Sequence, residues 1–306
     1  MLRHLASRVT QAVIATFGVL TIVFFVMRLS DDPTLLLVPQ GASAEQIAEL
    51  RHELGFDRPL IVQYGDYLGS LLRLDLGESL VQREPVASIV GQRIPYTLVL
   101  AGGALLVALG IGLPAGVAMA VWRGGMVERG LAAIVLAGQS LPTFWSGILL
   151  ILFFGVTLEW LPTSGADSPA SLIMPSLALG ALTMSTFARM VRIAVLDELH
   201  RDYVVAARAR GLSLAATVAR HVARNAAIPV VTVAALEIGN LLAGAVIVET
   251  VFAWPGIGQL AIQSIQARDF LVVQAIVLFV SLTYISMNLL ADLAYAAIDP
   301  RIRLAA

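Results

Sequence analysis

Residues 197–229 read DELHRDYVVAARARGLSLAATVARHVARNAAIP and lie between two long apolar runs. The stretch holds five of the chain's twenty basic residues, and every basic residue in the chain is an arginine. Alanine favours helix, and a glycine permits the left-handed turn that ends one. The sequence therefore predicts a short helix that Asp202 caps and Gly211 ends, followed by a second helix over about Leu214–Asn225.

The rest of the chain is far more apolar than this stretch. Of 306 residues, 58% are hydrophobic and 13% are charged, whereas soluble domains have about 25% charged residues. A helix needs about 20 apolar residues to cross a membrane. Six segments meet this requirement, which predicts an all-α polytopic membrane protein with six transmembrane helices: Val9–Leu29, Leu98–Val121, Leu131–Leu158, Leu172–Ile193, Ile228–Val248 and Val272–Ala296.

The first of these segments could be a transmembrane helix or a cleaved signal. Its apolar run is longer than the roughly 7–15 residues of a signal-peptide core, and no small-x-small cleavage motif follows it. We therefore expect a retained first transmembrane helix over residues 9–29, with residues 1–8 as an N-terminal segment before it.

The arginines are unevenly distributed between the two sides that these spans define. The two termini, the loop after the second span and the region after the fourth span hold thirteen arginines, and the opposite side holds seven. Five of those seven lie in one long segment that also carries ten acidic residues. Cytoplasmic loops carry an excess of basic residues. Both termini and the loop over residues 197–227 are therefore expected to be cytoplasmic.

The long segment over residues 30–97 is expected to be extracytoplasmic, helical and folded. Ser43 precedes Gln46 at the spacing of a capping box, and Gly55 stands where that helix would stop. Two interpretations are open: a helical pair on the outer membrane surface, or a docking platform for an external partner. The next stretch has apolar residues at helical spacing, namely Ile61, Tyr64, Leu68, Leu71 and Leu72.

Two absent residue types limit the chemistry of the chain. Without cysteine there can be no disulfide, thiolate metal site or cysteine nucleophile. Without lysine there can be no Walker-type phosphate loop and no Schiff-base amine. The four histidines show no paired metal-site spacing, and no Gly-x-Ser-x-Gly elbow occurs. We therefore expect no enzymatic activity, metal or cofactor in this chain, and no nucleic-acid partner.

The opening stretch resembles the coupling loop of permease subunits in ATP-binding-cassette (ABC) importers. That loop has Glu-Ala-Ala, three residues and a glycine, and this chain has VAA at 205–207 before Gly211. Valine replaces the glutamate, and Pro229 lies further from the glycine than in the general pattern. Both departures are similar to the peptide and nickel branch, in which DYV-x-x-AR-x-x-GL and RHxxRNAxxPVVT are typical. The motifs RIPYTLVLA, SLPTFWSGILL, ETVFAWPGIGQL and DLAYAAIDPRIR extend the resemblance to the first of the two permease subunits over nearly the whole chain.

This resemblance implies a type I ABC importer permease in the bacterial cytoplasmic (inner) membrane. A homologous second permease subunit would complete the translocation pathway, and an extracytoplasmic solute-binding protein would deliver the solute. ATP and Mg²⁺ would bind to two separate ABC ATPase subunits, which would bind the coupling loop. The competing interpretation of this loop is a membrane anchor whose arginines meet lipid phosphate. The residues expected to contact the ATPase are Asp202, Tyr203, Ala206, Ala207, Arg208 and Gly211.

The remaining residues, 98–306, are expected to form a five-helix transmembrane core that contains the coupling loop. Polar groups inside a membrane are costly and often functional, so the candidate pathway residues are Glu237, Asn240, Gln139 and Asn288. For Gln139 and Asn288, interhelical hydrogen bonding is the favoured interpretation. Pro114, Pro142 and Pro175 are expected inside spans, and GLPAG at 112–116 is a candidate close helix contact.

The sequence leaves the solute open. Peptides are the favoured class, and nickel complexes or glutathione-like solutes are the alternatives within the same machinery. The rival class is an ATP-independent transporter or channel, which would need its own coupling-ion site or selectivity ring.

Overall fold

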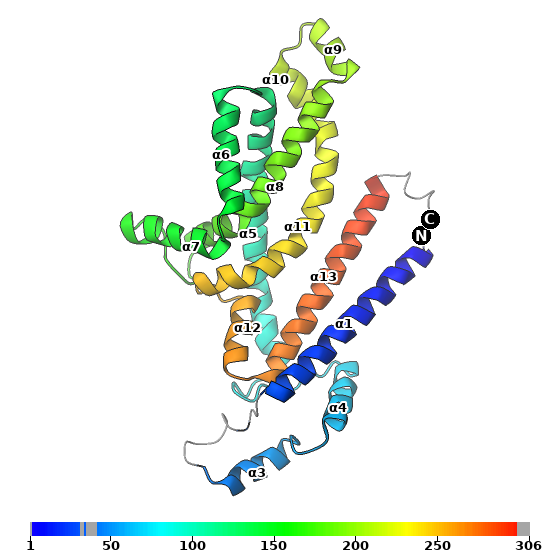
Figure 1. Ribbon diagram of the computed structural model, residues 1–306, viewed down its shortest axis with the longest axis vertical. Helices are drawn as coiled ribbons and strands as arrows, with labels where there is room; N and C mark the ends of the chain where they lie inside the picture. The colour runs from blue at the N-terminus through cyan, green and yellow to red at the C-terminus, as the bar shows by residue number, and fades with distance from the viewer. Residues whose placement is uncertain (1, 31–33, 35–41, 299–306) are drawn as a thin grey trace. The chain divides into compact units, whose positions relative to one another are not determined.

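The computed structural model of the chain describes residues 2–30, 34 and 42–298 (Figure 1), and these residues are almost entirely helical. They form no β-strand, and their one β-type pairing is an isolated bridge between Glu78 and Pro85. The elements are α1 (Leu2–Ser30), α3 (Ala44–Glu53), α4 (Leu60–Leu72), α5 (Val86–Val121), α6 (Met126–Ser140), α7 (Thr143–Leu150), a π-helical segment (Ile151–Thr157), a 3₁₀ turn (Pro169–Leu172), α8 (Ile173–Leu199), α9 (Asp202–Ala209), α10 (Leu214–Thr217), a second π-helical segment (Val218–Val222), α11 (Ala223–Val251), α12 (Ile257–Gln266) and α13 (Phe270–Ile298).

The chain divides into two compact units, which are described separately. Unit 1 comprises residues 1–96 and 256–285, and unit 2 comprises residues 97–255 and 286–306. The predicted coupling loop and the pathway candidates all lie in unit 2. The predicted extracytoplasmic helices lie in unit 1.

Several of the predicted spans coincide with long apolar helices. Within the described ranges, three helices are long and apolar enough to cross a membrane, namely Val86–Val121, Pro169–Leu199 and Phe270–Met287. A shorter apolar helix runs over Val13–Leu29. The all-helical membrane fold is therefore confirmed, whereas the count of six spans and the side of each terminus stay predictions.

The third predicted span, Leu131–Leu158, is wrong as a single helix. The structure bends by 110° between α6 and the helix over Thr143–Thr157, which makes this region a broken span or a re-entrant loop. The bend falls at Leu141 and Pro142, both of which have extended ψ angles, 128° and 138°. Proline lacks an amide hydrogen and disfavours the helical conformation of the residue before it, which explains why α6 stops at Ser140.

Other predicted boundaries shift by several residues. The helix that contains the second predicted span begins at Val86 rather than Leu98, so residues 86–97 belong to α5. The fourth runs on to Leu199 despite its arginines. Pro175 lies in the first turn of α8, where a missing amide hydrogen breaks no helical bond. Pro114 lies inside α5, as predicted.

In unit 2, α5 and α8 approach each other closely through glycines. A Cβ atom on Gly112 would lie 2.8 Å from the Met184 carbonyl oxygen, and one on Gly116 would lie 2.5 Å from that of Ala188. Both distances are shorter than a carbon–oxygen contact permits, so only glycine fits. The predicted close contact at GLPAG is therefore confirmed, and α8 also packs against α6, α7 and α11.

In unit 1, the predicted capping box is present. The Ser43 Oγ accepts a hydrogen bond from the Gln46 amide at 3.3 Å, and the Gln46 Oε1 accepts one from the Ser43 amide at 2.9 Å. Gly55 follows the end of α3 with φ +70°, which confirms it as the stop. Gln63 donates to the Phe56 and Arg58 carbonyls at 3.3 and 2.8 Å and so closes the link to α4.

The predicted stripe of α4 is partly on its packed face, because Tyr64, Leu68 and Leu71 are half-buried. Ile61 and Leu72 are exposed, whereas the half-buried Tyr64 and Tyr67 contact α1. The Tyr67 ring stacks on Phe24 at 5.5 Å, and the hydroxyls of Tyr64 and Thr21 lie 2.6 Å apart. Burial against α1, more than the neighbouring Tyr64 charge, raises the pKa of Tyr67 to about 12. The sequence pattern identified the helix and part of its packed side, but not Gln63 and Tyr67.

Candidate functional site

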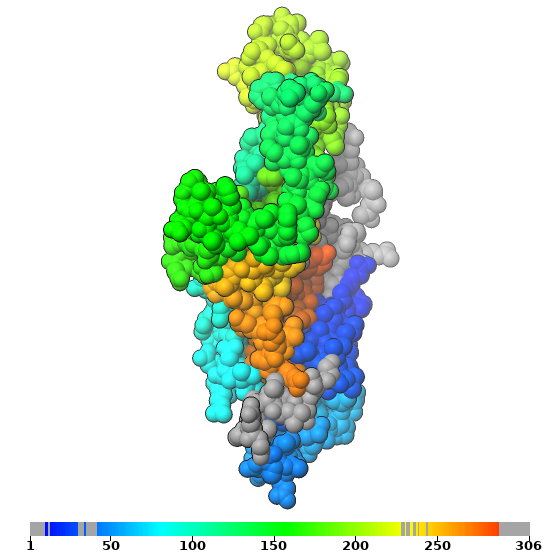
Figure 2. Space-filling model, turned by 60° about the vertical axis from the view of Figure 1, so that its left-hand side comes forward, coloured from blue at the N-terminus to red at the C-terminus, as the bar shows by residue number. Residues whose placement is uncertain are grey.

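The predicted coupling loop forms one end of unit 2. After α8 the chain turns at His200 and Arg201, forms the short helix α9, turns again at Gly211 and continues into α10. Figure 2 shows this region, in yellow-green, projecting beyond α6. A short helix is therefore carried directly between two long helices of the core, α8 and α11.

The turn after α9 is a Schellman motif, a helix end closed by two backbone hydrogen bonds across a left-handed residue. The Leu212 amide donates to the Ala207 carbonyl at 3.3 Å, and the Gly211 amide donates to the Arg208 carbonyl at 2.9 Å. Gly211 has φ +89°, which favours glycine. The prediction that Gly211 ends this helix in a left-handed turn is confirmed.

The start of α9 differs from the prediction. The N-cap position is Arg201, and Asp202 is the first helical residue, without a side-chain capping bond at this end. A carboxylate in the first turn still interacts favourably with the helix dipole. Asp202 therefore contributes charge at the start of α9 rather than a cap.

One face of α9 is buried and the other is exposed. Val204 and Ala207 are buried, and Val204 packs in a cluster with Val218 and Val222. Of the predicted contact residues, Asp202, Ala206, Arg208 and Gly211 are exposed, Tyr203 is half-buried and Ala207 is only 1% exposed. Ala207 therefore fixes α9 to the unit and offers no surface to a partner in this structure.

The exposed face also includes Val205, which sequence reasoning did not select. Its side chain is 63% exposed although it is apolar. It occupies the position at which the general pattern has glutamate, and this was the signal that could have singled it out. Together, Asp202, Val205, Ala206, Arg208 and Gly211 define what we call the α9 face.

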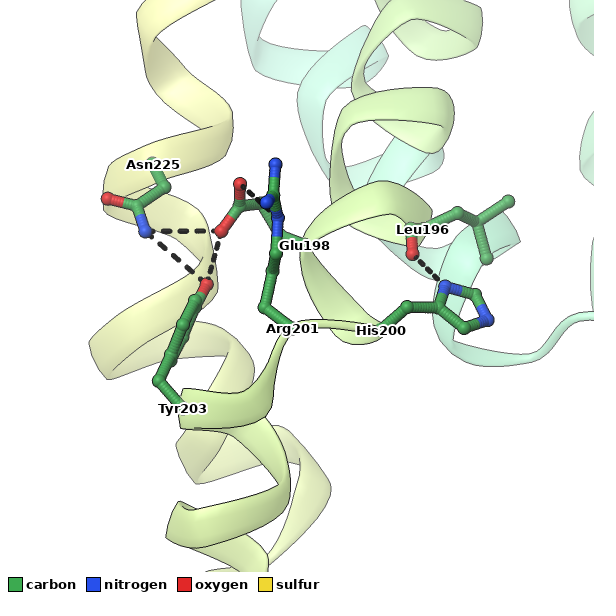
Figure 3. Close-up of polar contacts among 6 residues, drawn as sticks. All are labelled: Leu196, Glu198, His200, Arg201, Tyr203 and Asn225. Carbon is green, nitrogen blue, oxygen red and sulfur yellow. Dashed lines mark hydrogen bonds and ion pairs between the residues drawn. The ribbon is translucent and has the colours of Figure 1, made fainter.

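A polar cluster joins α9 to both long helices (Figure 3). The Tyr203 hydroxyl donates to the Glu198 Oε2 at 2.5 Å, and the Asn225 Nδ2 donates to the same oxygen at 3.2 Å. Burial and the bond to Glu198 raise the pKa of Tyr203, so its hydroxyl stays protonated and available as a donor. Glu198 ends α8, Tyr203 lies in α9 and Asn225 begins α11, so one carboxylate ties three helices together. Sequence reasoning missed Glu198 and Asn225, because their pairing depends on tertiary contact.

The second helix of the loop is longer than predicted. Ser213 caps it, with its Oγ accepting from the Ala216 amide at 3.3 Å. The chain then stays helical through α10 and the second π-helical segment into α11, so no break occurs at Asn225. Arg220 and Arg224 are both exposed, one turn apart. The helix that begins at α10 therefore runs into α11 without interruption, and the turn at Gly211 separates it from α9.

An ion pair lies at the start of α6. Glu128 accepts from Arg192 of α8, with the Oε1 atom 2.9 Å from Nε and 2.5 Å from Nη2. Its other oxygen accepts from the Gly124 amide at 2.5 Å. The turn between α5 and α6 is thus attached to α8 near the coupling loop.

The candidate pathway residues lie on three helices, α6, α11 and α13. Glu237 of α11 accepts from the Thr183 Oγ1 of α8 at 3.2 Å. Gln139 of α6 accepts from Arg189 of α8, which supports interhelical bonding for Gln139. Asn240 is exposed on α11. Asn288 lies in α13, but its side chain is outside the described part of the chain.

A cavity of about 270 Å³ lies where α6 breaks. Gln139, Ser140 and Pro142 line it from one side, and Ala178 and Leu182 of α8 line it from the other. Among the described residues, no group of three or more His, Cys, Asp or Glu side chains could hold a metal ion. The arrangement provides surfaces and polar contacts between helices.

Comparison with known proteins identifies the family. Residues 112–304 match the family described as "Binding-protein-dependent transport system inner membrane component", and residues 1–101 match its N-terminal companion, "Binding-prot-dependent transport system membrane comp, N-term". The chain is 42% identical over 304 residues to the "Glutathione transport system permease protein GsiC" of Escherichia coli (strain K12), covering 99% of both chains. The protein of the same name from Salmonella typhi is equally similar, at 42% identity over 99% of both.

Among solved structures, a chain of the MetNI methionine ABC transporter in an inward-facing form has a related fold. It superposes with a TM-score of 0.59 at 22% identity, covering 69% of this chain and 96% of that one. At this identity the likeness concerns the fold alone. With the family matches and the full-length relatives, it shows that this chain belongs to the inner membrane components of binding-protein-dependent transport systems, as a permease subunit of an ABC importer of the peptide/nickel type.

Proposed function

We propose that the α9 face is the surface on which an ABC ATPase subunit docks, and that its movement drives transport through this permease. The observation that carries the proposal is the attachment of the N-terminal end of α9, where Tyr203 bonds to Glu198 of α8 and to Asn225 of α11. A partner that displaces α9 must therefore displace both long helices. Because small side chains at Ala206 and Gly211 let a partner backbone approach closely, the face suits docking by packing.

The partners follow from this role. A homologous second permease would supply the other half of the pathway, two ATPase subunits would bind and hydrolyse ATP with Mg²⁺, and a solute-binding protein would deliver solute from outside. In this arrangement both termini and α9 are cytoplasmic, and the bent α6–α7 pair serves as one of six membrane crossings. The excess of arginine on that side supports this orientation.

The solute is proposed to be a small peptide, with glutathione-like peptides included. Support comes from the name of the full-length relatives, which are glutathione transport permeases. Nickel complexes are the alternative for this branch of the family.

Glu237 is the proposed pathway residue. It is half-buried, and the Thr183 hydroxyl leaves further acceptor positions of the carboxylate available. Replacing it with glutamine keeps the shape and removes the charge, so we expect Glu237→Gln to lower transport and change solute preference. Unchanged kinetics would assign Glu237 to helix packing alone.

The docking proposal can be tested by crosslinking, because the chain has no cysteine of its own. We expect Val205→Cys to form a crosslink with an ATPase subunit in the assembled importer, in amounts that change with ATP. Val127→Cys is the matched control, since Val127 is also an exposed valine, 45% exposed, in the first turn of α6. Equal crosslinking at both positions would refute a specific α9 surface. Transport by the purified chain without ATPase subunits would favour the rival class, an ATP-independent transporter.

A further inference from the structure

A cavity in unit 1, lined by both apolar and polar side chains, is distinct from the α9 face and the proposed pathway. It lies between the C-terminal end of α1, the helix α4 and the first turns of α13, elements that Figure 1 shows together. Its volume is about 220 Å³, which corresponds to several water molecules at about 30 Å³ each. Among the side chains that line it are Arg28, Phe56, Gln63, Tyr67 and Gln274.

Arg28 brings a positive charge into this cavity without a matching carboxylate in the described part of the chain. Its guanidinium lies over three aromatic rings, at 4.3 Å from the centroid of Phe56, 5.4 Å from Phe24 and 5.7 Å from Phe270. The Nε and Nη1 atoms are buried, and no described residue accepts a hydrogen bond from them. Buried charges are normally paired and hydrogen-bonded, so this guanidinium has the donors and charge to bind an anion.

Two buried glutamines have unused hydrogen-bonding atoms in the same cavity. Gln274 is 2% exposed, and neither its Nε2 nor its Oε1 has a partner among the described residues. Gln63 is 8% exposed, and its Oε1 is likewise without one. Leaving a buried polar group unsatisfied costs about 1–3 kcal/mol. Three side chains from three helices therefore converge on one space with donors and acceptors that the described chain does not use.

The acidic groups that line the cavity already have partners. The Asp66 Oδ2 accepts from the Arg58 Nη1 at 3.0 Å, and the Asp75 Oδ1 accepts from the Gly77 amide at 2.9 Å. Neither forms an ion pair with Arg28. Their charges would repel an anion close to them, so an anion is best placed next to Arg28 and the aromatic rings.

We propose that this cavity binds an oxyanion, a carboxylate or a phosphate group, with Arg28 supplying the charge and Gln274 Nε2 an additional donor. A guanidinium binds such groups through two parallel hydrogen bonds. The oxygens of Gln63 and Gln274 would accept from hydroxyl groups next to the anion. Such an oxyanion can come from the headgroup of an anionic phospholipid or from a soluble molecule, and the cavity chemistry is the same for both.

The test measures the thermal unfolding of the purified importer complex in uncharged detergent. The probes are short-chain phosphatidylglycerol and soluble glycerol 1-phosphate, each compared with sodium chloride at matched ionic strength. We expect a concentration-dependent rise in Tm for the wild type and at least a tenfold higher half-saturating concentration for Arg28→Gln. A response to phosphatidylglycerol alone identifies a lipid ligand, and a response to both identifies a soluble oxyanion; either supports the site.

Two further variants keep the proposal falsifiable if Arg28→Gln fails to fold. Gln274→Leu has a similar shape without the amide and should also weaken the response. Arg73→Gln is the matched control, because Arg73 is an exposed arginine of the same unit that does not line the cavity. No Tm response to either probe, or an equal response in wild type, Arg28→Gln and Gln274→Leu, would overturn the site and leave the cavity to water.

Discussion

Replacing Gly211 tests whether the turn after α9 matters for energy coupling. Gly211 has φ +89°, and a Cβ atom placed on it would meet nothing within 4 Å. Gly211→Ala therefore introduces backbone strain without a steric clash. The left-handed conformation costs an L-residue about 1–2 kcal/mol, which corresponds to a loss of about five- to thirty-fold in the population of this turn relative to competing ones.

A graded series separates strain from other effects. Asparagine tolerates the left-handed conformation better than alanine, so Gly211→Asn should retain more activity than Gly211→Ala. Proline fixes φ near −65° and removes the amide that donates to Arg208, so Gly211→Pro should abolish coupling. Gly211→Glu adds a charge to the same strain and should also abolish uptake while the chain still inserts.

The assay is solute-stimulated ATP hydrolysis, with uptake, in the reconstituted importer. Gly124→Ala is the matched control, because Gly124 has φ +81° and equally open space but lies in the turn between α5 and α6. We expect Gly211→Ala to lower coupling several-fold and Gly124→Ala to leave it close to wild type. Equal effects of the two substitutions, or Asn behaving like Ala at position 211, would refute the reasoning.

Three further predictions concern contacts elsewhere in the chain. Tyr203→Phe removes the donor to Glu198 and should lower the stability of unit 2 by about 1 kcal/mol. A double-mutant cycle with Asn225→Ala, followed by thermal unfolding, measures the interaction energy between Tyr203 and Asn225. Strictly additive losses of stability would show that the cluster does not act as a unit. Gly116→Ala should overpack α5 against α8 and destabilise by about 1–3 kcal/mol, whereas Gly110→Ala, with nothing within 4 Å, should not, so similar unfolding midpoints for the two would contradict the packing argument. The His52 Nδ1 lies 2.6 Å from the Asp57 Oδ2, and this hydrogen bond raises the pKa of His52 and lowers that of Asp57. The stability that the pair gives through His52 is fully present below the pKa of unfolded His52 and is lost as the pH rises through the raised pKa. The stability that it gives through Asp57 is fully present above the pKa of unfolded Asp57 and is lost as the pH falls through the lowered pKa. The amide protection factors in the α3–α4 link, which are intrinsic exchange rates divided by observed ones and so correct for the intrinsic pH dependence of exchange, should therefore be highest at mildly acidic pH, and His52→Ala should remove that maximum; an unchanged profile in the variant would show that the pair has no such role.

The features that the sequence predicted well are local ones. The Gly211 turn, the Ser43 capping box and the Gly55 stop each depend on residues within one or two helical turns of each other. Composition was likewise enough for the all-helical membrane fold. The cap at Ser213 was equally predictable from local sequence, because serine is a preferred N-cap residue, but only Asp202 was predicted as a cap in this loop.

The features that the sequence did not predict depend on tertiary contact. The sequence predicts Pro142 inside a span, but a bend of 110° at this point depends on how the neighbouring helices pack around it. The packed side of α4 includes Tyr64 of the predicted stripe, and also Tyr67, whose contact with Phe24 of α1 the spacing along α4 does not predict. The hydrogen-bond partners of Glu237 and Gln139 on α8 depend on how the helices are aligned against each other. Residue spacing along one helix does not predict this alignment.

The length of α8 has a mechanical consequence. A rod of 27 residues, rising about 1.5 Å per residue, is about 40 Å long, so a tilt of about 5° displaces its far end by about 3–4 Å. Thr183 and Arg189 bond to α11 and α6 from the middle of this rod. A small displacement of the Glu198 end of α8 would therefore also shift the contacts of α8 with α11 and α6. Substitutions that impair transport should accordingly be found along α8 at positions that contact no partner subunit.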